Sequence, residues 1–271
     1  MIALRWEWVA IGYHAYLLVL ALAIKRFARA RTAVFGCTIA VIVVVGAQSF
    51  LQPGPTTGRL TFSLLIPLVI LLVGYWLSGL FFVSPMRGIE RWLMAMDDRL
   101  LRRTGILAAH DAGPRLAREL FETAYALVYP VIPAAAVTLA IGGHLDAVPR
   151  FWSTVLLAEF VSYGMLPWLQ TRPPRAIESA AGARHAPSAV RQFNEAILNR
   201  GSIQVNTVPS GHAAGAVAAA LAVADVMPVA GIVFAFLAAA IVAATVLGRY
   251  HYLVDSLLGA LVAVSAWLIC R

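Results

Sequence analysis

The sequence predicts an all-α protein that is embedded in a membrane. Of its 271 residues, 61% are apolar and 13% are charged, and the mean hydropathy is +0.81. Soluble domains have about 45–50% apolar and about 25% charged residues, so this excess does not fit inside a soluble core. The apolar residues gather into runs near the roughly 20 residues that a membrane-spanning helix requires. We therefore expect about eight transmembrane helices: 8–24, 33–51, 60–83, 124–141, 151–169, 213–227, 229–247 and 252–269.

The first apolar run does not have the features of a cleaved signal peptide. It lacks a basic start, and no small-residue cleavage site follows it. We therefore expect it to stay in the mature protein, as the first of two accessory helices within residues 1–59. Residues 60–271 show no internal repeat or low-complexity linker and are predicted to form one membrane core.

An amphipathic helix is predicted between the third and fourth apolar runs, near residues 86–103. Four apolar residues recur there at helical spacing, while the charged residues lie mainly elsewhere around the helix. These apolar residues are Ile89, Leu93, Met96 and Leu100. Such a helix lies in the membrane interface or covers the bundle as a solvated helix, and an apolar stripe fits both arrangements equally.

The net charge of +8 comes from basic residues that are spread over the connections between apolar runs. A nucleic-acid-binding protein would gather them into one stripe, so membrane topology explains them better. With eight helices, the connections on one face carry 17 of the 21 Lys and Arg residues. The positive-inside rule then places residues 170–210 and 248–251 in the cytoplasm and both termini outside. We expect an integral protein of a bacterial plasma membrane.

Two residues at the start of the last apolar run have the spacing of a catalytic pair. His251 and Asp255 lie four residues apart, so on a helix they share one face and the carboxylate can accept a hydrogen bond from the imidazole. The other ring nitrogen then stays free to act as a base or a nucleophile, with Asp255 stabilising the positive charge that forms. A surface ion pair is the alternative, but ionisable groups at membrane depth are costly and usually functional.

The segment Pro209-Ser210-Gly211-His212 has the pattern of a helix start directly before an apolar run. Ser210 can cap the helix, and Gly211 lets the backbone approach a ligand. A helix N-terminus with a serine hydroxyl and free amide groups suits a phosphate, and His212 can protonate a departing oxygen. Taken alone, the tetrapeptide is equally explained as a simple cap.

Two arginines stand at the end of the fifth apolar run, in Thr171-Arg172-Pro173-Pro174-Arg175, where the prolines end the helix. Arg172 and Arg175 can bind phosphate oxygens bidentately and neutralise charge in a transition state, as magnesium does in other phosphoryl-transfer enzymes. Each arginine alone is also explained as a determinant of membrane topology.

Other polar residues near these motifs are weaker candidates. Glu159 and Tyr163 lie one turn apart in the fifth run and either line a headgroup cavity or satisfy each other inside the bundle. Asn206 and Thr207 either contact substrate or shape the loop before the Ser-Gly-His turn. The remaining histidines lack a carboxylate at a useful spacing and are predicted to be surface or interfacial residues: His14, His110, His144 and His185.

Taken together, the order Arg-Pro, Pro-Ser-Gly-His and His-x-x-x-Asp resembles the type 2 phosphatidic acid phosphatase superfamily over about residues 120–271. The resemblance implies a helical bundle with a six-helix core and a site without metal or cofactor. It assigns the covalent phosphohistidine to His251, the supporting carboxylate to Asp255 and the general acid to His212. It assigns phosphate binding to Arg172, Ser210, Gly211 and Arg249.

Two positions depart from the family pattern. The lysine that usually stands seven residues before the Arg-Pro arginine is replaced by Met165, and Arg175, one turn beyond Arg172, is the candidate to compensate. The arginine that usually stands six residues before the nucleophilic histidine is replaced by Thr245, and Arg249 is its expected replacement. These departures resemble the branch related to inositol phosphorylceramide synthases, which transfers a phosphoryl-alcohol group instead of hydrolysing it.

The resemblance therefore implies metal-independent hydrolysis of a lipid phosphate or prenyl (pyro)phosphate through a phosphohistidine intermediate. Transfer of an inositol-phosphate-like headgroup to a lipid alcohol is the alternative, because water and an alcohol can use the same residues. A non-catalytic transporter or scaffold is a second alternative, since eight membrane helices need no chemistry. The expected partners are the lipid phosphate and membrane lipids, and no pattern in the sequence indicates an oligomeric state. Many members of the resembled superfamily act on the outer face of the membrane, which is the alternative to the cytoplasmic face that the charge count predicts.

Overall fold

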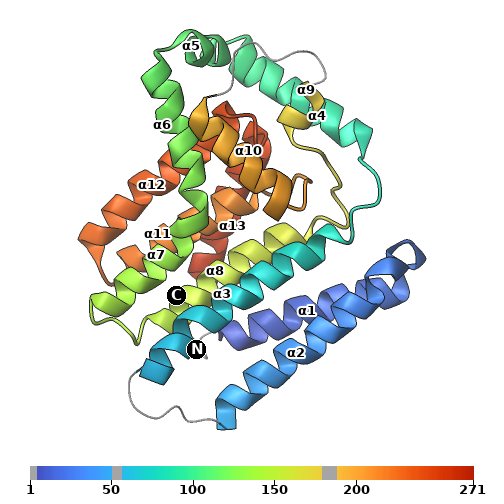
Figure 1. The fold of residues 1–271 in the computed structure, drawn as a ribbon, viewed down its shortest axis with the longest axis vertical. Helices are drawn as coiled ribbons and strands as arrows, with labels where there is room; N and C mark the ends of the chain where they lie inside the picture. The colour runs from blue at the N-terminus through green and yellow to red at the C-terminus, as the bar shows by residue number, and fades with distance from the viewer. Residues whose placement is uncertain (1–4, 51–56, 179–187) are drawn as a thin grey trace.

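The computed structural model describes residues 5–50, 57–178 and 188–271. Over these residues the chain is helical, with no strand and one isolated bridge between Thr171 and Asn206. The predicted all-α class is therefore confirmed. Figure 1 shows long helices packed side by side, with shorter helices gathered around one end of the bundle.

A helix occupies each apolar run that the sequence predicts to cross the membrane. The first helices in the chain are α1 (Trp6–Ala23), the 3-10 helix η1 (Lys25–Ala30), α2 (Arg31–Phe50) and α3 (Thr57–Gly79). Four shorter elements follow: α4 (Arg87–Asp97), the π-helix η2 (Asp98–Arg102), α5 (Ile106–Ala112) and α6 (Arg115–Ala126). The later helices are α7 (Val128–Ile141), α8 (Val148–Gly164), α9 (Pro174–Glu178), α10 (Ala189–Gly201), α11 (Gly211–Ala224), α12 (Pro228–Leu247) and α13 (Leu253–Cys270).

Fewer helices can span a membrane by their own length and hydropathy than the eight predicted. Among the described residues four can do so: Trp6–Ala23, Lys25–Ala47, Pro228–Leu247 and Leu253–Cys270. A fifth span results if α6 and α7, which meet at 58°, are one bent helix. The other three predicted spans fall short in length, because α8 has 17 residues, α11 has 14, and the apolar segment Ser63–Gly79 of α3 is also too short. Helices of this length depend on neighbouring helices to shield them in the membrane.

Large apolar side chains remain exposed on the surface of the long helices. On α12 and α13 they include Val229, Phe236, Leu257, Leu261 and Leu268. Soluble proteins rarely leave contiguous apolar surface of this kind uncovered, whereas lipid tails cover it in a membrane. The chain is an integral membrane protein.

The short helix α11 lies at the centre of the C-terminal helices, and α7, α8, α12 and α13 pack around it. Alanine and glycine dominate its sequence, and small side chains let neighbouring backbones approach closely. A Cβ atom added to Gly215 would collide with Glu159 of α8, and one added to Gly259 of α13 would collide with the backbone of Ser210. These contacts fix the N-terminus of α11, where His212 lies.

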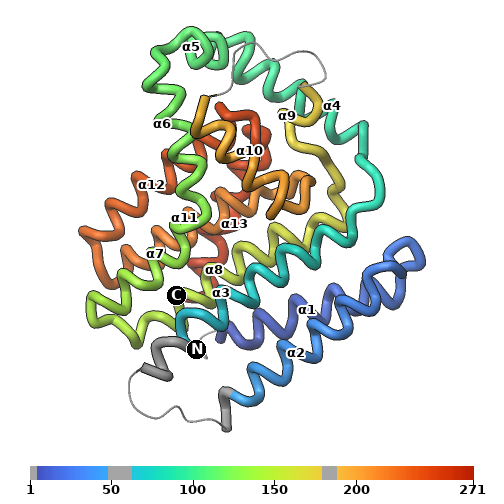
Figure 2. Tube along the Cα trace, in the orientation of Figure 1, coloured from blue at the N-terminus to red at the C-terminus, as the bar shows by residue number. Residues whose placement is uncertain are grey.

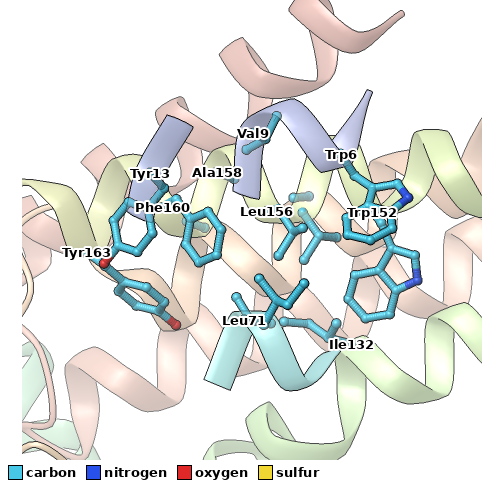
Figure 3. Packing of buried hydrophobic residues seen from close by; sticks show 14 of the residues in the cluster. Trp6, Val9, Tyr13, Leu71, Ile132, Trp152, Leu156, Ala158, Phe160 and Tyr163 are labelled. Carbon is cyan, nitrogen blue, oxygen red and sulfur yellow. The ribbon is translucent and has the colours of Figure 1, made fainter. Parts of the chain in front are cut away.

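The N-terminal helices α1 and α2 lie together at one side of the bundle (Figure 2), and α1 packs against α3 and α8. Buried aromatic and aliphatic side chains fill this contact, as Figure 3 shows for Tyr13 of α1, Leu71 of α3 and Trp152, Leu156 and Phe160 of α8. The rings of Tyr13 and Phe160 stack with their centroids 4.1 Å apart. Helix α1 is therefore packed onto the core through α3 and α8, and α2 packs against α1 and α3.

The short helices α4, α5, α6, α9 and α10 surround the end of the bundle at which α11 and α13 begin (Figure 1). The amphipathic helix predicted near residues 86–103 is formed by α4 and η2. Its buried face carries Leu93 together with two carboxylates, Glu90 and Asp97. Those carboxylates point toward the end of the bundle that holds the predicted catalytic residues.

Candidate active site

The structure brings His251 and Asp255 together. Asp255 lies in the first turn of α13, while His251 lies in the turn between α12 and α13, where its N–H donates to the Thr245 carbonyl at 2.9 Å. Nδ1 of the imidazole is 3.2 Å from Oδ2 of the carboxylate, and both side chains are buried. An ionised carboxylate only accepts hydrogen bonds, so this contact places the proton on Nδ1 and leaves the Nε2 lone pair free.

His212 faces that free nitrogen. Nε2 of His251 lies 3.2 Å from Nδ1 of His212, which stands in the first turn of α11. Ser210 caps this helix and accepts a hydrogen bond from the Ala213 N–H. The His212 ring also stacks on Tyr125 with centroids 5.7 Å apart. The two histidines therefore come from the starts of two adjacent helices and meet between them.

The loop before α11 supports these residues. Asn206 donates hydrogen bonds to Oδ2 of Asp255 at 2.7 Å and to the Thr171 hydroxyl at 3.1 Å. The Thr207 hydroxyl accepts the Gly211 N–H at 3.1 Å, and the Ser210 N–H donates to the Asp255 carbonyl at 2.9 Å. Asn206 thus lies behind the Asp255 carboxylate and holds it, while Thr207 shapes the turn and also lines the pocket beside the histidines.

Arg172, the Arg-Pro arginine, is paired with Glu90 of α4. The carboxylate accepts from the Arg172 backbone N–H at 2.9 Å, from Nε at 3.0 Å and from Nη2 at 2.8 Å. The hydrogen bond from the Arg172 side chain holds the pKa of Glu90 below its usual value. In this structure the Arg172 guanidinium is therefore neutralised by α4.

Arg249 is paired twice. Its guanidinium donates to Asp97 of α4 at 2.6 Å and to Glu178 of α9 at 2.9 and 3.1 Å. Burial works to raise the pKa of Glu178, but the hydrogen bonds and positive charges of Arg249 and Arg102 together outweigh it, and the pKa is lowered. Only 12% of the Arg249 side chain is exposed. The Arg249 guanidinium is therefore mostly buried against these two carboxylates.

Arg175 is the predicted phosphate-binding arginine that the structure places beside the histidines. It lines one pocket with His212 and His251, and its guanidinium carbon lies 5.2 Å from the centroid of the Tyr250 ring. In the described part of the chain no carboxylate lies within ion-pair distance of Arg175, in contrast to Arg172 and Arg249. The other lining residues are Tyr75, Tyr125, Tyr163, Pro173, Leu198, Ser202, Val205 and Thr207.

The surroundings of His251 favour its neutral form. Burial, and secondly the positive charge of Arg175, lower the pKa of the imidazole to about 3. A neutral imidazole keeps the lone pair that a nucleophile or a general base needs.

Among the described residues, no group of three or more His, Cys, Asp and Glu side chains has an arrangement that could hold a metal ion.

The three sequence motifs thus converge on one pocket at the starts of α11 and α13. Comparison with known families agrees with this geometry, because a sequence model described as the PAP2 superfamily matches residues 91–269. The chain belongs to the PAP2 superfamily. This confirms the resemblance to type 2 phosphatidic acid phosphatases, and the match begins within α4 and includes both histidines. No match was found among curated proteins or among solved structures.

Glu159 and Tyr163 lie behind the pocket of this PAP2 protein. Tyr163 lines the pocket, whereas the buried Glu159 carboxylate packs against Gly211 and Gly215 of α11. Its Oε2 atom has no hydrogen-bond partner. Glu159 therefore supports the helix that carries His212 from within the bundle, and Tyr163 separates it from the pocket.

The remaining histidines lie away from the PAP2 motifs, but one of them is not where it was predicted. His14 was expected at the surface or the interface, and it is fully buried in α1, where Nδ1 contacts the Ala10 carbonyl at 2.8 Å. Its ring packs edge-on against Phe160, so α8 covers it. His110 and His144 are partly exposed, and His185 lies outside the described residues.

Sequence reasoning missed the carboxylates that bind the arginines. Glu90 and Asp97 stand seven residues apart, which is two helical turns, and they bracket the buried Leu93. Acidic residues on the inward face of an amphipathic helix are unusual unless they are paired. The position of these two carboxylates on the apolar face could therefore have indicated basic partners. Their partners lie 82 and 152 residues away in the chain, which no local pattern could indicate.

Proposed function

We propose that this PAP2 protein hydrolyses a lipid phosphate through a phosphohistidine on His251, without a metal ion. The observation that carries the proposal is the placement of His251 between Asp255 and His212, with 3.2 Å to each. Asp255 holds the imidazole by Nδ1, so Nε2 faces the pocket as a nucleophile. The pocket opens where membrane helices α11 and α13 begin, which suits a substrate whose tail stays in the lipid.

In the first step Nε2 of His251 forms a bond to phosphorus while the bond from phosphorus to the lipid oxygen breaks. His212 gives its proton to that oxygen, so the lipid leaves as a neutral alcohol. The imidazole becomes cationic on attack, and the Asp255 carboxylate at Nδ1 stabilises this charge. His212 must then lie within reach of the leaving oxygen, and its present contact with Nε2 is consistent with that position.

In the second step a water molecule attacks the phosphohistidine. His212, now neutral and without the proton it gave away, takes a proton from the water as the new oxygen–phosphorus bond forms. The bond between nitrogen and phosphorus breaks, which releases inorganic phosphate and restores neutral His251. The guanidinium of Arg175, which lines the pocket, is the group proposed to hold the phosphate oxygens. Ser210 and Gly211, also predicted to bind phosphate, do not line the pocket, and their backbone N–H groups donate to the Asp255 carbonyl and the Thr207 hydroxyl.

A second candidate function is transfer of a phosphoryl-alcohol headgroup to a lipid alcohol, and the charges around the pocket favour it. Glu90 neutralises Arg172, while Asp97 and Glu178 neutralise Arg249. Of the three arginines predicted to bind phosphate, Arg175 lines the pocket and has no carboxylate partner among the described residues. One cation matches the single charge of a phosphodiester better than the double charge of a phosphate monoester.

Product analysis with purified protein tests the proposal and separates the two reactions. With phosphatidic acid as the sole lipid and excess EDTA, hydrolysis releases inorganic phosphate and diacylglycerol. A transferase releases none, and forms a new phosphodiester when phosphatidylinositol and a lipid alcohol are supplied together. His251→Ala should lower either activity by at least about 10³-fold, whereas His144→Ala, a partly exposed histidine between α7 and α8, should be unaffected. Activity retained in a folded His251→Ala variant would falsify the assignment.

We also propose that the pocket faces the cytoplasm, because the connections on its side of the membrane carry most of the basic residues. A single cysteine at Arg200 in α10 reports this side, and one at Asp146 between α7 and α8 reports the other. In a background without Cys37 and Cys270, an impermeant maleimide should label only the Asp146→Cys protein in intact cells. Labelling of Arg200→Cys before permeabilisation would place the pocket outside.

A further inference from the structure

Asp97 is bonded to both sides of His251. Its Oδ2 atom accepts from Nη1 of Arg249 at 2.6 Å, and its Oδ1 atom accepts from the backbone N–H of Leu253 at 3.0 Å. Arg249 stands two residues before His251, and Leu253 stands two residues after it. A single carboxylate from α4 therefore ties down the turn that carries the histidine at both of its ends.

The turn needs such support on the Arg249 side. Arg249 has a φ of 61°, a left-handed conformation that side chains other than glycine rarely adopt. Conformations of this kind persist where the surroundings hold them, and they cluster at functional sites. The backbone of the turn is also bonded to α12, through the N–H groups of Tyr250 and His251 on the Thr245 carbonyl, and to α9, whose Arg175 N–H donates to the Arg249 carbonyl at 3.0 Å. None of these bonds involves the Arg249 side chain or the N-terminus of α13. Asp97 supplies an anchor from a different helix.

The bond to Leu253 has a separate effect. Leu253 is the first residue of α13, and its N–H is among those that no carbonyl within the helix can satisfy. Tyr252, at the N-cap, provides no side-chain cap. Asp97 fills that role from α4 and places a negative charge at the positive end of the helix. It thereby fixes the first turn of α13, which also carries Asp255.

The burial of Asp97 shows that it is not a surface residue that only pairs with a charge in solvent. Its side chain is 1% exposed, and both of its oxygens are used in the two bonds described above. The next residue, Asp98, is much more exposed and pairs with Arg103 of the same segment. Two adjacent aspartates thus differ in surroundings, and the inward one contacts the turn that carries His251.

We propose that Asp97 is a positioning residue that sets His251 in line with the phosphorus atom by holding Arg249 and Leu253. This role rests on the proposed function, in which His251 is the nucleophile. It also gives Arg249 a structural task, because its guanidinium spans from Asp97 to Glu178 instead of reaching into the pocket. Misplacement of a reacting group by about 1 Å can cost about 100-fold in rate.

The test compares Asp97→Asn with Asp98→Asn, which removes the same charge one residue away. Asparagine still accepts from Leu253 but no longer neutralises Arg249. We expect kcat with phosphatidic acid to fall about 10- to 100-fold, with KM within about threefold because no pocket residue changes. Asp98→Asn should have the same kcat and KM as the unmodified protein. A folded Asp97→Asn protein with normal kcat, or one with raised KM and normal kcat, overturns the proposal.

A readout without turnover separates this test from that of the proposed function. In protein with ¹⁵N-labelled histidine, the Nδ1 proton that His251 donates to Asp255 should give a downfield resonance that is absent in His251→Gln. Asp97→Asn should shift or broaden it, and Asp98→Asn should leave it unchanged. Glu178→Gln removes the more exposed partner of Arg249 and should give a weaker change in the same direction, which keeps the test decisive if Asp97→Asn fails to fold. An unchanged resonance in every folded variant overturns the positioning role, even if the wild-type protein has no phosphatase activity.

Discussion

Asn206 donates a 2.7 Å hydrogen bond to Oδ2 of Asp255, the same oxygen that faces Nδ1 of His251. The other carboxylate oxygen of Asp255 has no hydrogen-bond partner. The orientation of the carboxylate therefore depends on Asn206 and on the histidine that it serves. Asn206, which the sequence suggests either as a substrate contact or as a residue that shapes the loop, thus holds the carboxylate beside the proposed nucleophile.

Replacement of Asn206 by alanine should lower kcat about 10-fold and leave KM nearly unchanged. Loss of one partner of a buried hydrogen bond costs about 1–3 kcal/mol, and here the loss falls on the group that orients His251. The measurement is steady-state release of phosphate from phosphatidic acid. Asn199→Ala on the exposed face of α10 is the matched control and should have normal kinetics. A change confined to KM would return Asn206 to the role of a substrate contact.

Arg175 and Arg172 should respond differently to substitution by methionine. Arg175 lines the pocket without a carboxylate partner, so Arg175→Met should raise KM about 10-fold or more, since a hydrogen bond to a charged group contributes about 1.5–3 kcal/mol. Arg172 is bound by Glu90 in this structure, so Arg172→Met should lower the melting temperature more than it changes KM. The measurements are KM from steady-state kinetics and the melting temperature from thermal unfolding, for both variants in detergent. Equal effects on KM would show that Arg172 leaves Glu90 when substrate binds.

The pairing of Glu90 with Arg172 predicts a pH-dependent stability. The pKa of Glu90 is lowered in the folded protein, so its contribution is fully present above the unfolded pKa of about 4.3 and is lost as the pH falls through the folded value. At pH 7, Glu90→Gln should destabilise the protein by about 1 kcal/mol, because 41% of the Arg172 side chain is exposed and solvent screens the pair. The stabilities of the variant and the wild-type protein should therefore approach each other as the pH falls below the unfolded pKa, and should converge below the folded pKa.

Thermal unfolding between pH 3.5 and 7 measures this convergence. Glu195→Gln is the control, since Glu195 pairs with Arg191 on the surface of α10 and its side chain is 45% exposed. That variant should differ little from the wild-type protein at any pH in this range. A destabilisation by Glu90→Gln that stays constant down to pH 3.5 would contradict the charge pairing and leave packing as the cause.

The predictions that succeeded from sequence alone depended on short-range patterns. His251 and Asp255 stand four residues apart, and Ser210 precedes an apolar run, so both features could be seen locally. The all-α class followed from composition. The number of spanning helices could not be obtained in this way, because apolar runs do not show that α11 stops after 14 residues or that α6 and α7 meet at 58°.

The partners of the arginines could not be predicted because they depend on where α4 packs. Arg172, Arg175 and Arg249 are equivalent in sequence as basic residues near helix ends. The fold distinguishes them by placing the inward carboxylates of α4 against two of the three and leaving Arg175 at the pocket. A local pattern gives the type of charge in a segment, whereas tertiary packing decides which opposite charge it meets.

Gly215 should not tolerate a larger side chain, because Glu159 fills the space beside it. A Cβ atom at this position would collide with the Glu159 carboxylate and approach Ile132. Gly215→Ala should therefore destabilise the protein by about 1–3 kcal/mol, the usual cost of overpacking. It should also lower kcat, since Gly215 and His212 share α11. Gly12→Ala in α1, where nothing lies within 4 Å of the added atom, should be harmless.

A double-mutant cycle assigns the collision to its partner. Glu159→Ala removes the carboxylate, so alanine at position 215 should cost less in that background, with a coupling energy of about 0.5–3 kcal/mol. Thermal unfolding and kcat are measured for both single variants and for the double variant. If the two substitutions are additive, Glu159 does not set the position of α11 and another neighbour, such as Ile132, does. If they couple in kcat as well as in stability, Glu159 supports the active site through the helix that carries His212.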